Sequence, residues 1–267
     1  MTIKLFLKKL HWLLASQFGC DAIHFLYALR GVPGFMRDWH CFRRNYTGIM
    51  KLTPCLHDRY EESGTTKSEY FWQDLLVARW IFDAHPKKHV DVGSRVDGFI
   101  AHVASFREIE VLDVRPTTTQ IPGVVFKQSD LMQPEGFLFV RDGYCDSLSC
   151  LHAIEHFGLG RYGEPIDPQG FERGIANMAQ MLKPDGKFYL SAPIGFERVE
   201  FNAHRVFDPR TIIRCAESSE LQLQQLTVIS AGGGVRQVQR SEDALLELAQ
   251  SRYNLGIFVF INKRQFE

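Results

Sequence analysis

The sequence predicts an α/β protein with a doubly wound, mostly parallel sheet that carries helices on both faces. Three observations support this class. A chain of 267 residues with 45% hydrophobic residues can bury one large core. From about residue 70 onward, apolar segments of strand length alternate with segments of helical periodicity. The stretch HVDVGSRVDGF, residues 89–99, has the pattern of a buried strand that runs into a glycine turn and then a helix.

Residues 1–70 are predicted to form an N-terminal helical cap. A first helix within residues 1–20 places Lys4, Lys8 and His11 opposite an apolar face, which consists of Ile3, Phe6, Leu7, Leu10, Leu13, Leu14 and Phe18. We expect a second helix at 21–30, a turn at the GVPG of 31–34 and a third helix at 37–46. The first helix is expected either to pack on its own domain or a dimer partner, or to lie on a membrane surface.

Residues 71–267 are predicted to form the sheet domain. Helices are expected at 71–84, 98–106, 171–182, 208–216 and 242–249. Strands are expected at 89–92, 108–114, 123–130, 145–154, 187–193, 221–230 and 256–261. Turns separate them at KPDG, residues 183–186, and at AGGG, residues 231–234. Such a sheet binds ligands at the carboxyl ends of its strands.

Composition excludes several classes of function. Lysine plus arginine equals aspartate plus glutamate, 31 each, so no global field favours nucleic acid, and we expect no nucleic-acid partner. The six cysteines contain no C-x-x-C pair, which is typical of reduced thiols in a cytoplasmic protein. The charge-free run from Leu10 to Cys20 is too short for a membrane span and lacks a lipoprotein signal. We therefore expect a cytoplasmic protein, with the inner face of the membrane as the alternative.

The glycine turn indicates which nucleotide the protein binds. In the dinucleotide fingerprint the middle glycine lets the backbone approach a pyrophosphate. Here the three fingerprint positions are Gly93, Arg95 and Gly98, and the Arg95 side chain would crowd that pyrophosphate. S-adenosylmethionine has no phosphates, and Asp91 can face its positively charged amino-acid end. We predict that Asp91, Gly93, Ser94 and Gly98 bind the cofactor.

Two further strand ends carry carboxylates. Asp113 ends the second strand about 20 residues after the turn, as expected for a residue that binds both ribose hydroxyls. Asp130, followed by Leu131, ends the third strand and is placed to meet an adenine amino group. The alternative is that these glycines and aspartates serve only turns and helix caps.

At these motifs the sequence resembles the class I S-adenosylmethionine-dependent methyltransferases, from about residue 70 to the end. The motifs are VDVGSRVDGF, Asp113, Asp130 and MLKPDGKFYLSAP. More narrowly, VGSRVDGF, SLSCLHAIEHFGLGRYGEPIDPQG and FNAHRVF are similar to a family catalogued as a domain of unknown function, DUF268. The resemblance implies a Rossmann-like, seven-stranded sheet and S-adenosylmethionine as cofactor, with S-adenosylhomocysteine as product.

Two loops rich in histidine and arginine are expected to overhang the methyl group. We predict His156 as the general base, with Glu155 to orient it and His204 or His152 as alternative bases. His152, Arg161, Tyr162 and Arg205 are the predicted substrate residues, the arginines as binders of a phosphate or carboxylate. The alternatives are that His156 is a core histidine paired with Glu155, and that the arginines pair with Glu164 or Asp208.

The H-x-x-E-H pattern of residues 152–156 also raises the question of a metal. On a helix, His152 and His156 would share a face, as zinc ligands do, but the stretch follows a strand and a zinc peptidase is not expected. The region also resembles an E-x-x-E-H run that binds magnesium in some ubiquinone-pathway methyltransferases. We predict no metal, with a divalent ion at His152, Glu155 and His156 as the alternative.

The sequence thus leads to one function and two alternatives. The first is O-methylation of a sugar, glycan or other small polar acceptor, as in polysaccharide biosynthesis. The second is a methyltransferase fold that binds a ligand without turnover. The third is a nicotinamide-dependent sugar-modifying enzyme, which Arg95 and the lack of a Tyr-x-x-x-Lys pair disfavour.

Overall fold

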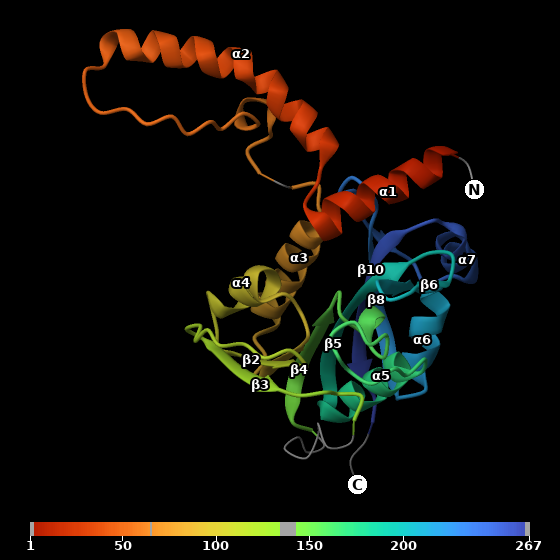
Figure 1. Cartoon of the computed structure of the whole chain (residues 1–267). Helices are drawn as coiled ribbons and strands as arrows, with labels where there is room; N and C mark the ends of the chain where they lie inside the picture. The colour runs from red at the N-terminus through yellow and green to blue at the C-terminus, as the bar shows by residue number, and fades with distance from the viewer. Residues whose placement is uncertain (1–2, 65, 134–142, 265–267) are drawn as a thin grey trace. The chain divides into compact units, whose positions relative to one another are not determined.

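A computed structural model describes residues 3–64, 66–133 and 143–264 of the chain, with the backbone alone for residues 3–5 and 9 (Figure 1). The side chains of Ile3 and Lys4, which the sequence places on opposite faces of the first helix, therefore lie outside the described residues. The chain divides into two compact units, Met1–Thr65 and Thr66–Glu267. The boundary predicted at 70/71 falls inside a helix of the second unit.

The second unit is built on a sheet of eight strands in the order β3-β2-β1-β4-β5-β10-β8-β9. The first five strands of this order are parallel to one another, and β10 is antiparallel to both of its neighbours. The strands are β1 (His89–Val92), β2 (Ile109–Asp113), β3 (Val124–Gln128), β4 (Cys145–Leu151), β5 (Leu182–Ile194), β8 (Leu221–Ile229), β9 (Val235–Val238) and β10 (Asn254–Asn262). The mostly parallel α/β class is confirmed.

The sheet differs from the predicted seven strands by β9, which pairs antiparallel with β8 at the edge. The glycine turn at 231–234 therefore closes a hairpin, and the residues after it were missed because Val235–Val238 is short and largely exposed. A separate two-stranded hairpin, β6 (Arg198–Glu200) with β7 (His204–Val206), was also missed. It lies in the loop after β5 that the sequence assigns to the site.

Two layers of helices cover the sheet (Figure 1). One face packs against α3 (Glu69–Ala84), the π-helix Val96–Ile100 and α4 (Ala101–Ala104), around residues such as Ile81 and Val111. The other face packs against α5 (Gly170–Met181), α6 (Pro209–Glu217) and α7 (Glu242–Gln250), around residues such as Met178 and Leu190. Because both faces are covered, β1 and most of β2 and β4 are buried, and polar residues such as Asp91 and Ser149 are buried with their apolar neighbours.

The turn predicted at 183–186 lies inside β5. The strand begins at Leu182 and passes through these residues, where Asp185 has a φ of 58° and the pairing with β4 shifts register between Cys145 and Ser147. The turn-forming residues therefore produce an irregularity in a long strand instead of ending an element.

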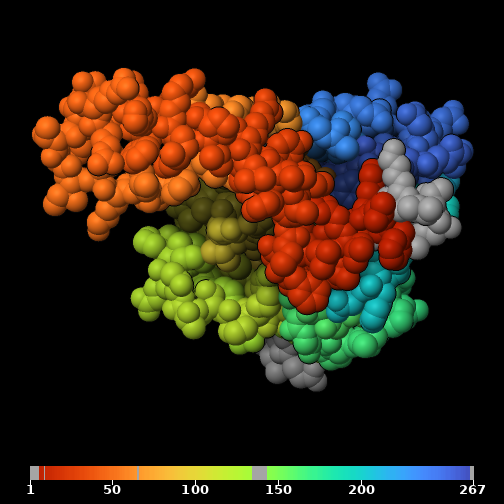
Figure 2. All heavy atoms as spheres, turned by 45° about the horizontal axis from the view of Figure 1, so that its top comes forward, coloured from red at the N-terminus to blue at the C-terminus, as the bar shows by residue number. Residues whose placement is uncertain are grey.

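The first unit contains α1 (Ile3–Phe18), α2 (Ala22–Asn45) and a short 3-10 helix (Asp58–Tyr60), which Figure 2 shows in red and orange. The predicted turn at 31–34 is wrong, because α2 continues through Pro33. Gly31 is buried against the backbone of Leu56, whose carbonyl oxygen leaves no room for a Cβ. This glycine therefore serves a close approach of two segments and not a turn. No helix in the described residues has the length and apolar character that crossing a membrane requires.

Candidate active site

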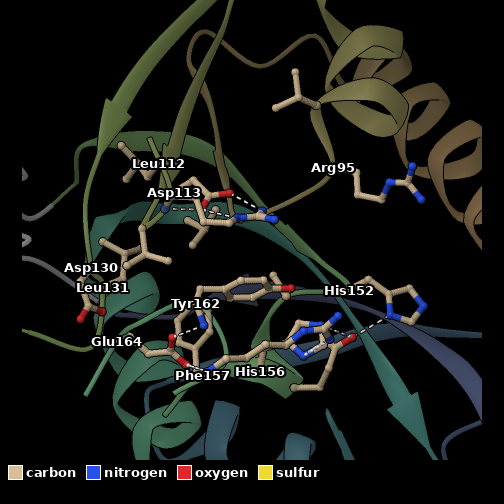
Figure 3. A pocket seen from close by; sticks show the side chains of 18 of the residues that line it. Arg95, Leu112, Asp113, Asp130, Leu131, His152, His156, Phe157, Tyr162 and Glu164 are labelled. Atoms are coloured by element: carbon tan, nitrogen blue, oxygen red, sulfur yellow. Dashed lines mark hydrogen bonds and ion pairs between the residues drawn. The ribbon is translucent and has the colours of Figure 1, made fainter. Parts of the chain in front are cut away.

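A cavity of about 690 Å³ opens at the carboxyl ends of β1, β2 and β4 (Figure 3). All its lining residues belong to the second unit. Parallel strands bring their carboxyl ends to one edge of the sheet, so residues 93, 113 and 152 meet there although they are far apart in sequence. Of the predicted site residues, those that line the cavity are Gly93, Asp113, Asp130, Leu131, His152, Glu155, His156, Arg161, Tyr162 and His204.

The glycine turn forms the first wall. Gly93 has a φ of +71°, the left-handed conformation that glycine adopts without strain, and a Cβ there would lie 3.0 Å from the Cβ of Ala153. Arg95 follows it in the wall, pairs with Asp97 at 2.7 Å and lies 5.4 Å from the centre of the Tyr70 ring. The residue at the middle fingerprint position therefore borders the cavity.

Asp91 does not line the cavity and has a different role from the predicted one. Its carboxylate is fully buried and accepts hydrogen bonds from the backbone and hydroxyl of Ser94 and from the Ser149 hydroxyl, at 3.0, 2.6 and 2.5 Å. Burial raises the pKa of Asp91 to about 7. Asp91 and Ser94 thus link the turn to β4. They support the wall of the cavity but do not line it.

Gly98 also lies outside the cavity wall. A Cβ there would lie 2.6 Å from a carboxylate oxygen of Asp74 on α3. The glycine therefore permits close packing of the helix after the turn against α3, which is a packing role and not contact with a ligand.

Asp113 lies at the end of β2, where the sequence places it. Its two carboxylate oxygens accept hydrogen bonds from the Arg115 side chain at 3.0 and 2.6 Å. The Arg115 guanidinium also lies 4.6 Å from the centre of the Tyr162 ring, so Asp113, Arg115 and Tyr162 form a continuous contact across the cavity. Arg115 was missed by the sequence reasoning, although its position two residues after the carboxylate was a signal.

Asp130 and Leu131 form the wall beyond β3. The Asp130 carboxylate accepts a hydrogen bond from the backbone of Met132 at 2.9 Å, and Leu131 is buried beside it. Leu131 is held in turn by Asn177 of α5, which donates to its carbonyl at 2.7 Å. An apolar surface with a carboxylate at its edge suits a flat heterocycle that carries an amino group.

The loop after β4 contains a buried ion pair between His152 and Glu155. The His152 Nδ1 lies 2.7 Å from a Glu155 oxygen, and its Nε2 lies 3.3 Å from a Glu69 oxygen without hydrogen-bond geometry. Burial alone would lower the pKa of His152, but the charges of Glu155 and Glu69 raise it to about 9. Burial acts to raise the pKa of Glu155, yet His152 holds it below its ordinary value. At neutral pH the pair is therefore charged on both sides.

Sequence reasoning missed the residues that surround this ion pair. Tyr70 stacks on the His152 ring with centroids 4.4 Å apart, and the Tyr253 hydroxyl donates to Glu69 at 2.6 Å. Glu69 and Tyr70 begin α3, for which Ser68 is the N-cap. The capping pattern predicts where such a helix begins, but Tyr253 precedes β10 and only the fold brings it here.

His156 has the opposite electrostatic environment from His152. Burial lowers its pKa, the nearby Glu155 acts to raise it, and Arg161 lowers it further. Its Nδ1 lies 2.8 Å from the carbonyl oxygen of Ala203. A carbonyl only accepts, so Nδ1 carries the proton and Nε2 keeps its lone pair. Because its pKa is lowered, His156 is a neutral imidazole at neutral pH, and its Nε2 lies 3.5 Å from the Arg161 guanidinium, which can donate to it.

Arg161 and Tyr162 continue this wall of the cavity. Arg161 donates to the Ala203 carbonyl at 2.9 Å, and no carboxylate in the described residues forms an ion pair with it. Glu164 accepts hydrogen bonds from the backbones of Arg161 and Tyr162 and so holds the loop without neutralising the guanidinium. The Tyr162 ring meets the His156 ring edge-on, with centroids 5.7 Å apart.

Arg205 does not belong to the cavity, which corrects the prediction that it binds substrate. It is 5% exposed and donates to the carbonyls of Glu155, Phe157 and Pro168. Nor does it pair with Asp208, which caps α6 and pairs with Arg210. The Arg205 side chain therefore holds the His152–Glu164 loop in place by binding the backbone carbonyls of that loop. The adjacent His204 lines the cavity.

The structure offers no metal site in its described residues, since no group of three histidine, cysteine, aspartate or glutamate side chains is arranged to hold an ion. His152 and Glu155 bind each other instead. The loop is also not one long helix, because only Ile154–His156 form a 3-10 turn. The predicted alternative of a divalent ion at His152, Glu155 and His156 therefore lacks the ligand geometry.

Comparison with solved structures supports the predicted α/β fold. The chain is similar to the [4+2]-cyclase SpnF, with a TM-score of 0.50 and 12% identity over 76% of this chain and 86% of that one. It is similar to the CurJ carbon methyltransferase, with a TM-score of 0.50 and 10% identity over 74% of this chain and 56% of that one. The N-methyltransferase NodS from Bradyrhizobium japonicum WM9 matches with a TM-score of 0.49 and 14% identity, over 75% of this chain and all of that one.

The second unit therefore has a Rossmann-like fold of the kind seen in the cyclase SpnF and the CurJ methyltransferase. Within it, residues 132–216 match a family model described as Caenorhabditis protein of unknown function, DUF268. The matched segment contains the His152–Glu164 loop and most of α6. Both resemblances predicted from the motifs are confirmed. No curated protein matches the chain.

Proposed function

We propose that the protein is an S-adenosylmethionine-dependent methyltransferase that methylates a hydroxyl of a sugar, a glycan or another small polar acceptor. The observation that carries this proposal is the composition of one cavity. One wall holds Asp113 and Asp130 at the strand ends, and another holds the neutral His156 beside the guanidinium of Arg161. A nucleoside site and a proton acceptor therefore share one space.

The cavity suits the cofactor in size and in chemistry. Its volume lies within the roughly 300–1,000 Å³ of small-molecule sites. Asp113 would hold the ribose hydroxyls, Leu131 the face of the adenine and Asp130 its amino group. Arg115 donates three hydrogen bonds to Asp113, one from its backbone and two from its side chain. A carboxylate offers about four acceptor positions, so one remains for a ribose hydroxyl, and the second hydroxyl would have to displace one bond of the Arg115 side chain.

Bound there, S-adenosylmethionine supplies a methyl group activated for in-line displacement. Nε2 of His156 would accept the proton of the acceptor hydroxyl, whose oxygen would take the methyl group, with S-adenosylhomocysteine as the leaving group. The hydrogen bond from Nδ1 to Ala203 fixes the tautomer that this step requires. His152 is a poorer base, because the raised pKa keeps it protonated at neutral pH. His204, whose pKa is lowered by burial, is the alternative base.

His152 and Glu155 are positioning residues in this scheme. Glu155 belongs to the same 3-10 turn as His156, and its nearer oxygen lies 3.8 Å from Nε2 of His156. A carboxylate at this distance stabilises the imidazolium that forms when His156 accepts a proton. Arg161 and Tyr162 would hold the acceptor, Arg161 through a phosphate or carboxylate group.

The first test is calorimetric titration of the full chain with S-adenosylmethionine and S-adenosylhomocysteine, with NAD as the control ligand. We expect micromolar binding of the first two and none of NAD. Asp113→Ala should weaken binding by about 10- to 100-fold, since it removes hydrogen bonds to a charged acceptor. Asp97→Ala, which removes an exposed carboxylate of the same rim, is the matched control and should bind as the wild type does.

The outcomes of this test separate the functions. Binding followed by methyl transfer to a glycan panel supports the proposal, and binding without transfer to any acceptor supports a fold that binds without turnover. Absence of binding to both sulfur compounds would contradict the proposed cofactor. Binding of NAD in their place would support the nicotinamide-dependent alternative.

A further inference from the structure

Helix α2 of the first unit has an exposed apolar stripe. Phe25, Leu29, Val32 and Met36 recur at helical spacing and are 63, 49, 37 and 48% exposed. Side chains at this spacing lie along one face of a helix. Four large apolar side chains on one solvent-facing stripe are unusual for a protein surface, because soluble chains seldom expose apolar patches without a partner.

Helix α1 has the same character. Its exposed apolar residues include Phe6, Leu10, Trp12, Leu13 and Phe18. Neither hydrophobic core cluster contains a residue of the first unit, and Gly31 is the only buried residue of α2. In the described residues these helices therefore lack a core of their own to cover their apolar faces, and their stability requires an external surface.

The charge of the two helices identifies the chemistry of that surface. Residues 3–45 contain seven lysines and arginines and two aspartates, whereas the whole chain is balanced at 31 and 31. Lys8 and Arg44 are exposed. A segment that combines exposed apolar residues with net positive charge matches the anionic face of a lipid bilayer.

We propose that α1 and α2 bind the surface of an anionic membrane, with Phe25, Leu29, Val32 and Met36 inserted among the headgroups and the basic residues against lipid phosphates. Association with a second copy would bring two such segments of equal positive charge together, which is unfavourable. The bilayer covers the same apolar surface and attracts the charge. No helix in the described part of the chain meets the criteria for a span, so the contact is at the membrane surface.

Vesicle co-sedimentation of the full chain tests this proposal. We expect binding to vesicles of equal parts phosphatidylglycerol and phosphatidylcholine, weak binding to phosphatidylcholine alone, and release by salt. Leu29→Ser combined with Met36→Ser should weaken binding by about tenfold or more, from the loss of buried apolar area. Lys8→Glu combined with Arg44→Glu should do the same, because each basic residue near the surface contributes roughly fivefold.

Matched controls change exposed residues of the second unit. Leu246→Ser on α7 and Arg236→Glu on β9 should leave vesicle binding unchanged. Circular dichroism should show an increase in helix when the wild type binds anionic vesicles, which checks the state of α1 and α2 directly. Equal binding to neutral and anionic vesicles, or no binding to either, would overturn the proposal. So would light scattering that shows a dimer whose formation the Leu29 and Met36 substitutions abolish.

Discussion

His152 and His156 are one helical turn apart in sequence, and their surroundings assign them opposite charge states. His152 lies between two carboxylates, which outweigh the desolvation that would otherwise keep it neutral. His156 is partly buried beside the Arg161 guanidinium and donates to a carbonyl. One histidine is therefore suited to hold a structure together and the other to accept a proton.

His156→Ala should reduce methyl transfer by about 10²- to 10⁴-fold while leaving S-adenosylhomocysteine affinity unchanged, because it removes a base and not a cofactor contact. The wild-type rate should stay level as pH falls to about 6.5 and decline only below it, since the pKa of His156 is lowered. The rate of S-adenosylhomocysteine release, measured over a range of pH, gives both the loss of activity in the variant and the pH dependence of the wild type. If His156→Ala keeps the wild-type rate and pH profile, His156 is not the general base and His204 becomes the candidate.

Glu155→Gln should lower the free energy of unfolding by about 3–5 kcal/mol at neutral pH, because it leaves a buried imidazolium without its main partner. The folded pKa of His152, about 9, exceeds the ordinary 6.5, so its stabilisation is complete below 6.5 and is lost as pH rises through 9. The difference between wild type and variant should therefore shrink in alkaline solution. Urea unfolding at neutral and alkaline pH tests this.

Glu217→Gln is the control for that measurement, since Glu217 forms an exposed ion pair with Arg240. Its removal should cost no more than about 1 kcal/mol. A Glu155 variant as stable as this control would mean that the His152 ion pair contributes little to the fold.

Among the secondary-structure elements, the turn after β1 connects the sheet to the cavity. Its left-handed Gly93 reverses the chain, and Asp91 with Ser94 links the turn to the neighbouring strand β4. The turn-forming pattern predicted this element correctly. What the pattern did not show is that the Asp91 carboxylate accepts hydrogen bonds from Ser94 and Ser149, because the second bond depends on β4 lying beside β1.

Gly93→Ala should destabilise the protein by about 1–2 kcal/mol, since a non-glycine residue is strained at positive φ. It should also weaken S-adenosylhomocysteine binding, because the added Cβ crowds Ala153 at the wall of the cavity. Gly163→Ala, at a φ of +90° with open space around it, is the matched control for strain alone. Gly163→Ala should lower the free energy of unfolding by a similar amount and leave S-adenosylhomocysteine affinity unchanged. Equal binding by the two variants would contradict a role for the turn in the site.

The chain as a whole consists of two units of unequal character. The second has two apolar cores, one on each side of its sheet, whereas α2 of the first unit buries only Gly31. Every residue that lines the candidate active site lies between Glu69 and Tyr253. We therefore expect the second unit to fold and to bind the ligand without residues 1–65.

A chain that begins at residue 66 should fold with a midpoint of thermal unfolding within a few degrees of the full chain, and it should bind S-adenosylhomocysteine equally well. Differential scanning calorimetry and titration measure the two properties. A truncated chain that is unfolded, or that binds more weakly by tenfold or more, would mean that residues 1–65 complete the domain.

The sequence by itself determined the α/β class, the positions of most strands and helices, and the strand ends at Gly93, Asp113 and Asp130. These features depend on periodicity and turn chemistry, which are local. The tertiary structure alone decided which polar side chains face the cavity. Asp91 and Arg205 were predicted as ligand-binding residues and are buried supports, whereas Glu69, Arg115 and Tyr253 enter the site unpredicted. The physical reason is that burial and charge pairing depend on contacts between distant segments, and the sequence pattern does not specify those contacts.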